Sequence, residues 1–355
     1  MKRFAWIGLC AVTVAAIALC GCGKKTAPVG NSAVGAPKGN AAGAATSAGG
    51  KKITICMLPK TKGLPYFTSC YDGAKQAAAE LGDVDLQYDG PTDGSPEKAA
   101  ALVEKWVLKG ADVIAVSCND PDVLGPVMKK AKEKGVKVIT WDADAAPDTR
   151  DFFVNQATAE QIGFGLVDTM AKDFGGTDPT GKVAIVTARL TAANQNEWMK
   201  YMKERLKKYP KMQLVATKPS NEDQKLAMEV TSDLMKAYPD LKGVFGISSV
   251  SFPGAAEAIK QAGKTGKVFV TGLSTPNDMR AYVKEGTVKS VLLWNTVDLG
   301  YLTVEVGEAL ATGKLKPGDK TFTSKKLGVK TIKGDNVLLG NPLIFTKENI
   351  DQYKF

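Results

Sequence analysis

The amino-acid sequence predicts an α/β protein with two doubly wound parallel-sheet lobes. Short apolar runs alternate with amphipathic stretches between residues 53 and 311, and the same rhythm occurs in both halves of that region. Strands that alternate with helices in this way form parallel sheets covered by helices on both faces. The region that follows residue 50 is also larger than one hydrophobic core normally supports, so two lobes are expected.

We expect strands in the first half at residues 53–58, 84–88, 113–117, 136–141 and 152–155. In the second half they are expected at 183–187, 214–216, 243–247, 268–273 and 288–294. Amphipathic spacing predicts helices at 67–81, 96–109, 121–134, 159–174, 195–208, 221–237, 253–262, 277–285 and 299–311. Gly82, Gly110 and Gly135 follow the first three helices, and glycine is the usual residue that ends a helix.

Residues 1–21 are typical of a secretion signal. Lys2 and Arg3 supply its positive start, and residues 4–19 form an apolar run that is short for a membrane-spanning helix. Leu19, Gly21 and Cys22 resemble a lipobox, in which the cysteine becomes the lipid-carrying N-terminus. Ordinary cleavage and release of a secreted protein is the alternative. Either way we expect the protein in the cell envelope, in the periplasm or on the outer face of the membrane.

Residues 22–50 are almost wholly small or polar, so they are predicted to form a disordered, lipid-anchored tether. Of the six cysteines in the chain, Cys56, Cys70 and Cys118 lie in the body. Buried thiols are the default expectation for them, although an oxidising location also allows a disulfide.

The composition argues against several classes of function. The chain contains no histidine, which removes the commonest general base and metal ligand, so we expect no metal site and no enzymatic activity. No GxGxxG segment follows a strand, and no cofactor is expected. The net charge of +10 includes no basic stripe interleaved with aromatic residues, so no nucleic-acid partner is expected.

Polar and aromatic side chains follow the expected strands at their carboxyl ends, where open parallel sheets bind ligands. Amides, hydroxyls and a few charges suit vicinal hydroxyl groups, and aromatic faces suit the C–H side of a sugar ring. Some of these residues have a structural alternative, since Asp120, Asn194 and Asn277 also suit helix N-caps. The candidate ligand-binding residues are Lys60, Tyr66, Phe67, Asp142, Gln156, Asn194, Gln195, Ser248, Ser249, Ser274 and Trp294.

Several segments resemble the periplasmic solute-binding proteins of ABC sugar importers, in the ribose-type group. The resemblance is greatest to the branch that contains the rhamnose-binding protein and the autoinducer-2 receptor, and it covers nearly all of residues 52–355. The segments are 58–63 (LPKTKG) with Tyr66 and Phe67, 140–144 (TWDAD), 153–156 (FVNQ), 194–198 (NQNEW), 271–276 (TGLSTP), 293–294 (LW) and 345–350 (FTKENI).

The resemblance implies a type I periplasmic binding protein fold, in which a hinge of three segments joins the lobes. It places the crossings near residues 156, 295 and 327, so that the first lobe contains residues 51–155 and 296–326. The second lobe then contains residues 156–294 and 327–355. It further implies a monomer that binds a monosaccharide by hinge closure and delivers it to an ABC permease with its cytoplasmic ATPase.

The identity of the sugar depends on a few contacts. Lys60, Asp142 and Gln195 stand where the autoinducer-2 receptor has ligand-contacting Lys, Asp and Gln. At its other three positions this chain has Asn194 for an Asp, Ile247 for a Pro and Ser249 for an Ala, which argues against that ligand. Compared with the ribose receptor, Ser274 replaces an Asp and Trp294 a Gln.

Segments 193–196 (ANQN), 298–301 (DLGY) and 337–342 (VLLGNP) are closer to rhamnose-binding relatives, so rhamnose is the best single ligand. The alternatives are an autoinducer-2-type signal receptor, a sugar sensor for a membrane kinase or chemoreceptor, and a sugar-modifying enzyme.

Overall fold

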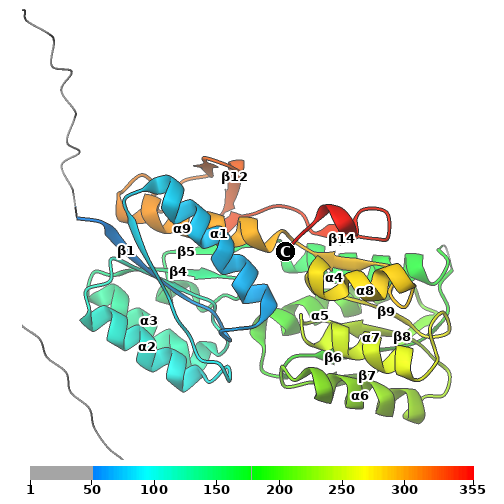
Figure 1. The fold of residues 1–355 in the computed structure, drawn as a ribbon. Helices are drawn as coiled ribbons and strands as arrows, with labels where there is room; N and C mark the ends of the chain where they lie inside the picture. Colours follow the sequence, from blue (N-terminus) through cyan, green and yellow to red (C-terminus); the bar gives the residue numbers. More distant parts are fainter. Residues whose placement is uncertain (1–50, 177) are drawn as a thin grey trace, which may run out of the picture. The chain divides into compact units, whose positions relative to one another are not determined.

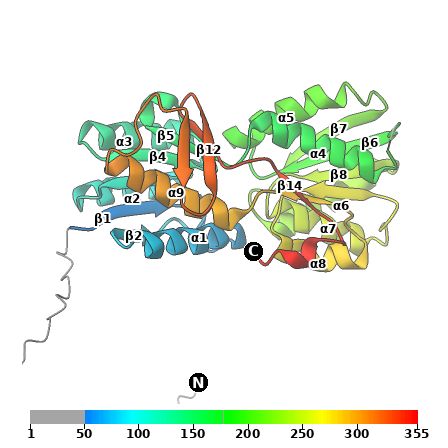
Figure 2. The ribbon, with the colours of Figure 1, turned by 90° about the horizontal axis from the view of Figure 1, so that it is seen from above.

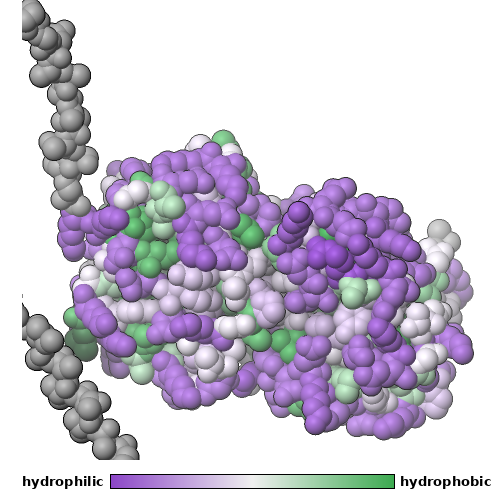
Figure 3. Space-filling model, viewed as in Figure 1, coloured by the Kyte–Doolittle hydropathy of each residue, from purple (hydrophilic) through white to green (hydrophobic). Residues whose placement is uncertain are grey.

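Two α/β lobes make up the body of the protein in the computed structural model, which describes residues 51–176 and 178–355 (Figure 1). The expected signal, Cys22 and the tether lie outside these residues. No helix among the described residues has both the length and the apolar character that a membrane crossing requires. The face drawn in Figure 3 is mostly hydrophilic, with small separate hydrophobic patches.

Lobe 1 contains the sheet with strand order β11-β12-β13-β5-β4-β3-β1-β2. Helices α1 and α9 pack together on one of its faces, and α2 and α3 pack together on the other. Its helices are α1 (Pro65–Leu81), α2 (Pro96–Leu108), α3 (Pro121–Glu133) and α9 (Thr296–Ala311), with a short 3-10 helix at Pro147–Thr149. Its strands are β1 (Ile53–Leu58), β2 (Val84–Tyr88), β3 (Val113–Val116), β4 (Lys137–Trp141), β5 (Phe152–Asn155), β11 (Thr321–Ser324), β12 (Gly328–Lys333) and β13 (Asn336–Leu338).

Lobe 2 contains a parallel sheet of order β7-β6-β8-β9, continued by an antiparallel pair of β10 and β14. Helices α4 and α5 pack as one pair, and α6 and α7 as another (Figure 2). Its strands are β6 (Gly181–Thr187), β7 (Met212–Pro219), β8 (Leu241–Gly246), β9 (Phe269–Gly272), β10 (Val291–Leu293) and β14 (Leu343–Phe345). Its helices are α4 (Ala159–Asp173), α5 (Ala193–Leu206), α6 (Gln224–Ala237), α7 (Ser251–Gln261) and α8 (Pro276–Glu285), with a 3-10 helix at Ile350–Gln352.

The central strands are apolar on both sides because both faces of each sheet are covered. In β1, Ile55 and Met57 belong to the core that includes α1 and α9, whereas Cys56 and Leu58 belong to the core under α2 and α3. The core under α1 continues without a break into lobe 2. Cys56, Cys70 and Cys118 are buried free thiols, as predicted from the sequence.

The chain passes between the lobes at residues 156–158, 294–295 and 339–342, where β5 leads to α4, β10 to α9 and β13 to β14. The third crossing differs from the expectation near residue 327. Residues 328–338 form a hairpin whose strand β13 pairs in parallel with β5, so they belong to lobe 1 and not to lobe 2. The sequence does not reveal this, because β12 is largely exposed and β13 has only three residues.

Asp173, at the end of α4, gives lobe 2 an expected pH dependence. Burial raises the pKa of this carboxyl to about 6, although Ser290 donates a hydrogen bond to its Oδ1 atom. The folded state therefore retains the proton that the unfolded state loses near pH 4, and stability should fall as the pH rises from about 4 to about 6.

Asp173→Asn mimics the protonated acid and should stabilise the protein above pH 6 by roughly 3 kcal/mol, the equivalent of a two-unit pKa shift. Below pH 4 it should have no effect. Urea unfolding of both proteins across this range checks the prediction, and an equal difference at every pH would contradict it.

Candidate functional site

A cavity lies between the carboxyl ends of the strands of the two lobes. Its empty space, counting the open mouth, is about 440 Å³. Lobe 1, lobe 2 and the second crossing all contribute to its wall. The lining residues are Lys60, Leu64, Tyr66, Phe67, Asp142, Asn194, Gln195, Trp198, Glu222, Ile247, Ser248, Ser249, Leu273, Leu293 and Trp294.

Asp142 is the buried carboxylate on the lobe 1 side of this cavity. Its Oδ1 atom accepts a hydrogen bond from the Tyr66 hydroxyl (2.8 Å), and its Oδ2 atom accepts one from Ser117 (2.7 Å). Its backbone has a φ of 62°, in the left-handed region that Asp and Asn tolerate best after glycine. Gln156 supports this turn, because its Nε2 donates to the carbonyl oxygen of Asp142 (3.0 Å).

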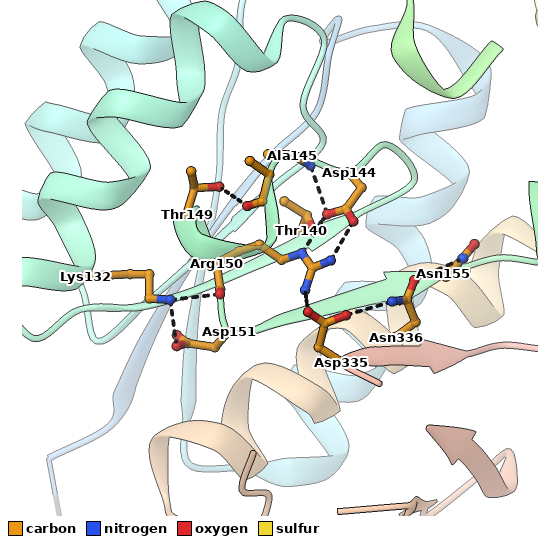
Figure 4. A network of polar contacts seen from close by, with 11 residues as sticks. Lys132, Thr140, Asp144, Ala145, Thr149, Arg150, Asp151, Asn155, Asp335 and Asn336 are labelled. Carbon is orange, nitrogen blue, oxygen red and sulfur yellow. Dashed lines mark hydrogen bonds and ion pairs between the residues drawn. The ribbon is translucent and has the colours of Figure 1, made fainter. Parts of the chain in front are cut away.

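An ion-pair network centred on the buried Arg150 holds the loop that follows Asp142 (Figure 4). The guanidinium of Arg150, whose side chain is only 1% exposed, donates two hydrogen bonds to the carboxylate of Asp144 (2.7 and 2.6 Å). Its third nitrogen lies 2.6 Å from Asp335, in the turn between β12 and β13. The network therefore joins the β4 loop to the hairpin before the third crossing.

Lys60 connects the two lobes across the cavity. Its Nζ atom lies 3.7 Å from Oδ2 of Asp142 in lobe 1 and donates to Oδ1 of Asn194 in lobe 2 (3.3 Å). Asn194 is free for this contact because helix α5 begins before it, after Ala192, so it is not the N-cap. A lysine and an amide held in this way can each bind a ligand hydroxyl as well.

Gln195 has a defined orientation. Its Oε1 accepts hydrogen bonds from the backbone N–H of Ala188 (2.8 Å) and from the hydroxyl of Thr187. An N–H donor identifies the acceptor atom of the amide, so the Nε2 group is the one left to donate. The residue therefore offers a ligand two N–H donors and no acceptor.

Four aromatic side chains line the cavity. The rings of Tyr66 and Phe67 meet edge to face at 5.0 Å, and those of Trp198 and Trp294 at 6.2 Å. Trp294 donates from Nε1 to the Tyr66 hydroxyl (3.0 Å), which in turn donates to Asp142. Burial and the Asp142 charge raise the pKa of Tyr66, so its phenol stays protonated as this donor.

Nine of the eleven predicted site residues line the cavity, and the other two lie behind its wall. These two are Gln156 and Ser274. Ser274 is buried and donates to the backbone oxygen of Ser249 (3.1 Å). Ser248 shares a hydrogen bond with Ser251, which also contacts Ser220, so these three hydroxyls on the lobe 2 side of the cavity form a chain.

Of the residues considered as N-caps, Asp120 caps α3, whereas Thr275 rather than Asn277 caps α8.

Sequence reasoning missed Trp198 and Glu222. Trp198 lies on the buried face of α5, one turn after Asn194, and helical periodicity would have placed it there. Glu222 was missed because the amphipathic pattern assigned residues 221–223 to the next helix. In the structure α6 begins at Gln224 with Asp223 as its N-cap, and Glu222 belongs to the preceding loop. The remaining lining residues that were not predicted are apolar: Leu64, Ile247, Leu273 and Leu293.

This geometry, with a polar and aromatic cavity between two doubly wound lobes, agrees with comparisons to known proteins. A family model described as "Periplasmic binding protein domain" matches residues 55–315. The chain belongs to the periplasmic binding protein family. The type I fold predicted from the sequence is confirmed, and membership of a family of binding proteins agrees with the prediction that the chain is not an enzyme.

Relatives of this periplasmic binding protein include the ribose import binding protein RbsB of Salmonella typhimurium. It is 26% identical over 265 residues, which cover 74% of this chain and 86% of the relative. LsrB from Clostridium saccharobutylicum, solved in complex with AI-2, has a TM-score of 0.81 at 28% identity, covering 85% of this chain and all of that one.

A solute-binding protein of an ABC transporter from Clostridium phytofermentans, with bound L-rhamnose, has a TM-score of 0.80 at 27% identity. That comparison covers 85% of this chain and 98% of the other.

Proposed function

We propose that this chain is the extracytoplasmic sugar-binding protein of an ABC importer, with a monosaccharide bound in the cavity between its lobes. The observation that carries the proposal is the cavity itself. Asp142 and Lys60 from lobe 1 face Asn194 and Gln195 from lobe 2, beside a wall of aromatic rings. Donors and acceptors of this kind bind vicinal hydroxyls, and the rings cover the C–H face of a sugar.

Contacts from both lobes explain how binding would close the hinge. A sugar held by Asp142 alone contacts one lobe, whereas in the closed form it also contacts Gln195. Binding shifts the equilibrium toward closure only by this difference in affinity. The three crossings then absorb the rotation, and the closed form is the one presented to the permease and its ATPase.

L-Rhamnose is the proposed ligand. Its support is the likeness of segments 193–196, 298–301 and 337–342 to rhamnose-binding relatives, together with the structural similarity to a protein with bound L-rhamnose. Autoinducer-2 is the second candidate, favoured by the similarity to LsrB and by Lys60, Asp142 and Gln195. The cavity-lining residues Ile247 and Ser249 count against it, because both differ from the receptor.

Calorimetry of the full chain with L-rhamnose, D-ribose, D-allose, D-arabinose and autoinducer-2 tests the proposal. We expect L-rhamnose to bind most tightly, and recovery of unchanged sugar from the complex separates a receptor from an enzyme. If no saccharide releases heat or raises the unfolding temperature, the proposal is wrong. Tight binding of autoinducer-2 alone would establish the signal receptor instead.

The envelope location and the lipid on Cys22 remain part of the proposal. A lipidated chain should begin at Cys22 and carry the mass of a diacylglyceryl group, and mass spectrometry of the purified N-terminal peptide measures this. An unmodified N-terminus would support ordinary secretion.

A further inference from the structure

Glu222 is a cavity residue to which the proposed function assigns no role. It lies on the loop between β7 and α6 and lines the cavity together with Lys60 and Ser248. Its Oε2 atom is shielded from solvent and has no hydrogen-bond partner among residues 51–176 and 178–355. Since buried polar atoms are nearly always hydrogen-bonded, an unpartnered carboxylate oxygen at a ligand site indicates that its partner comes from outside the chain.

The backbone of this loop is strained at two consecutive residues. Asn221 and Glu222 have φ values of 53° and 59°, and neither is glycine. The end of β6 holds the loop in place, because the backbone N–H groups of Ser220 and Asn221 donate to the carbonyl oxygens of Thr187 (2.8 Å) and Ala188 (2.7 Å). Strain that the surrounding structure maintains in this way is concentrated at ligand sites.

The charges around Glu222 indicate what kind of partner fits. Lys60 and Arg189 are the positive groups that face it, Asp142 is the negative group, and Ser248 is the neighbouring hydroxyl. Burial raises the pKa of Glu222, and Lys60, the Ser248 hydroxyl and Arg189 oppose this effect. A cationic ligand would be repelled by Lys60, whereas a neutral hydroxyl can donate to the carboxylate in a charge-assisted hydrogen bond.

We infer that Glu222 is a specificity-determining residue whose Oε2 accepts a hydrogen bond from a ligand hydroxyl, and that Lys60 disfavours an amino sugar at this site. The inference rests on the proposed function and names the group by which lobe 2 selects its ligand. A hydrogen bond from the ligand favours the ionised carboxylate, so binding should release a proton. Affinity should therefore increase from mildly acidic to neutral pH.

The test compares the full wild-type chain with Glu222→Gln by titration calorimetry, using the sugar that the wild type binds best. We expect Glu222→Gln to bind this sugar about 10-fold more weakly, because a charge-assisted hydrogen bond becomes a neutral one. The heat of binding should depend on the ionisation enthalpy of the buffer in the wild type only. Glu229→Gln is the matched control, because Glu229 is an exposed carboxylate of α6 outside the cavity wall.

A series of monodeoxy sugars identifies the hydroxyl concerned. The analogue that lacks it should lose more affinity for the wild type than for Glu222→Gln. Wild-type affinity and proton release in Glu222→Gln would overturn the inference and leave the proposed function intact. Tighter binding of an amino sugar than of its neutral parent would also overturn it. If the wild type bound no saccharide, the proposed function would be wrong, and the inference with it.

Discussion

Asp142→Asn is expected to weaken sugar binding by at least about 100-fold, because the charge-assisted hydrogen bonds from ligand hydroxyls become neutral ones. The amide keeps an oxygen that can accept from Tyr66, and asparagine tolerates the left-handed backbone at this position. The amide nitrogen would face Lys60, which loses its negative partner at 3.7 Å. Calorimetry of sugar binding measures the effect.

Asp142→Asn should lower the stability of the ligand-free protein only modestly, because Lys60 loses its counter-charge but still donates to Asn194. Unfolding without ligand measures this loss and so separates a role in binding from a role in folding. Asp142→Ala is a poorer test. It leaves the buried hydroxyls of Tyr66 and Ser117 without their acceptor, so it should also lower stability. Asp148→Asn, at an exposed carboxylate of the same lobe, is the charge-matched control. Sugar binding by Asp142→Asn at wild-type affinity would remove Asp142 from the site.

Gly300→Ala should cause a large loss of stability in lobe 1. A Cβ atom at Gly300 of α9 would lie 1.7 Å from the backbone oxygen of Cys70 in α1, and one at Gly73 would lie 1.7 Å from that of Val297. Both obstacles are backbone atoms, so the helices themselves would have to separate. We expect a loss of at least about 3 kcal/mol, at the upper end for overpacked cores.

Gly125→Ala is the control for this effect. Gly125 lies inside α3, where the nearest atom to a new Cβ is a methyl carbon of Thr149 at an ordinary 3.5 Å. Alanine there should change stability by less than about 1 kcal/mol, because its better helix propensity is offset by the crowding of a Cβ atom directly before Pro126. Chemical unfolding of both variants gives the comparison. Equal midpoints would show that α1 and α9 adapt to a methyl group between them.

The sequence predicted much of the fold because the central strands of doubly wound sheets are apolar runs between amphipathic helices. All ten expected strands and nine expected helices have counterparts among the described residues. The failures are β11 to β14, which are short and partly exposed, and the third crossing that depends on them. Short edge strands have a weak period-2 signal, and their position depends on pairing with a distant strand such as β5.

The candidate site shows the same division. The rule that ligands bind beyond the carboxyl ends of parallel strands was enough to select nine residues that the structure brings to one cavity. It did not distinguish Asn194, whose side chain contacts Lys60, from Asp120, whose side chain caps a helix. Both residues follow a strand, and only the point at which the next helix begins separates their roles.

From the sequence alone come the α/β class, the two lobes and the polar ends of their strands, because hydrophobic periodicity and loop chemistry are local properties of a chain. The tertiary structure decided how these ends face one another. Lys60 contacts both Asp142 and Asn194, and Arg150 joins two loops that are far apart in the chain. Glu222 lies in the loop before α6 and not in the helix that the sequence predicted. Contacts between residues this far apart in the chain depend on how strands and lobes pack, and no local pattern encodes them.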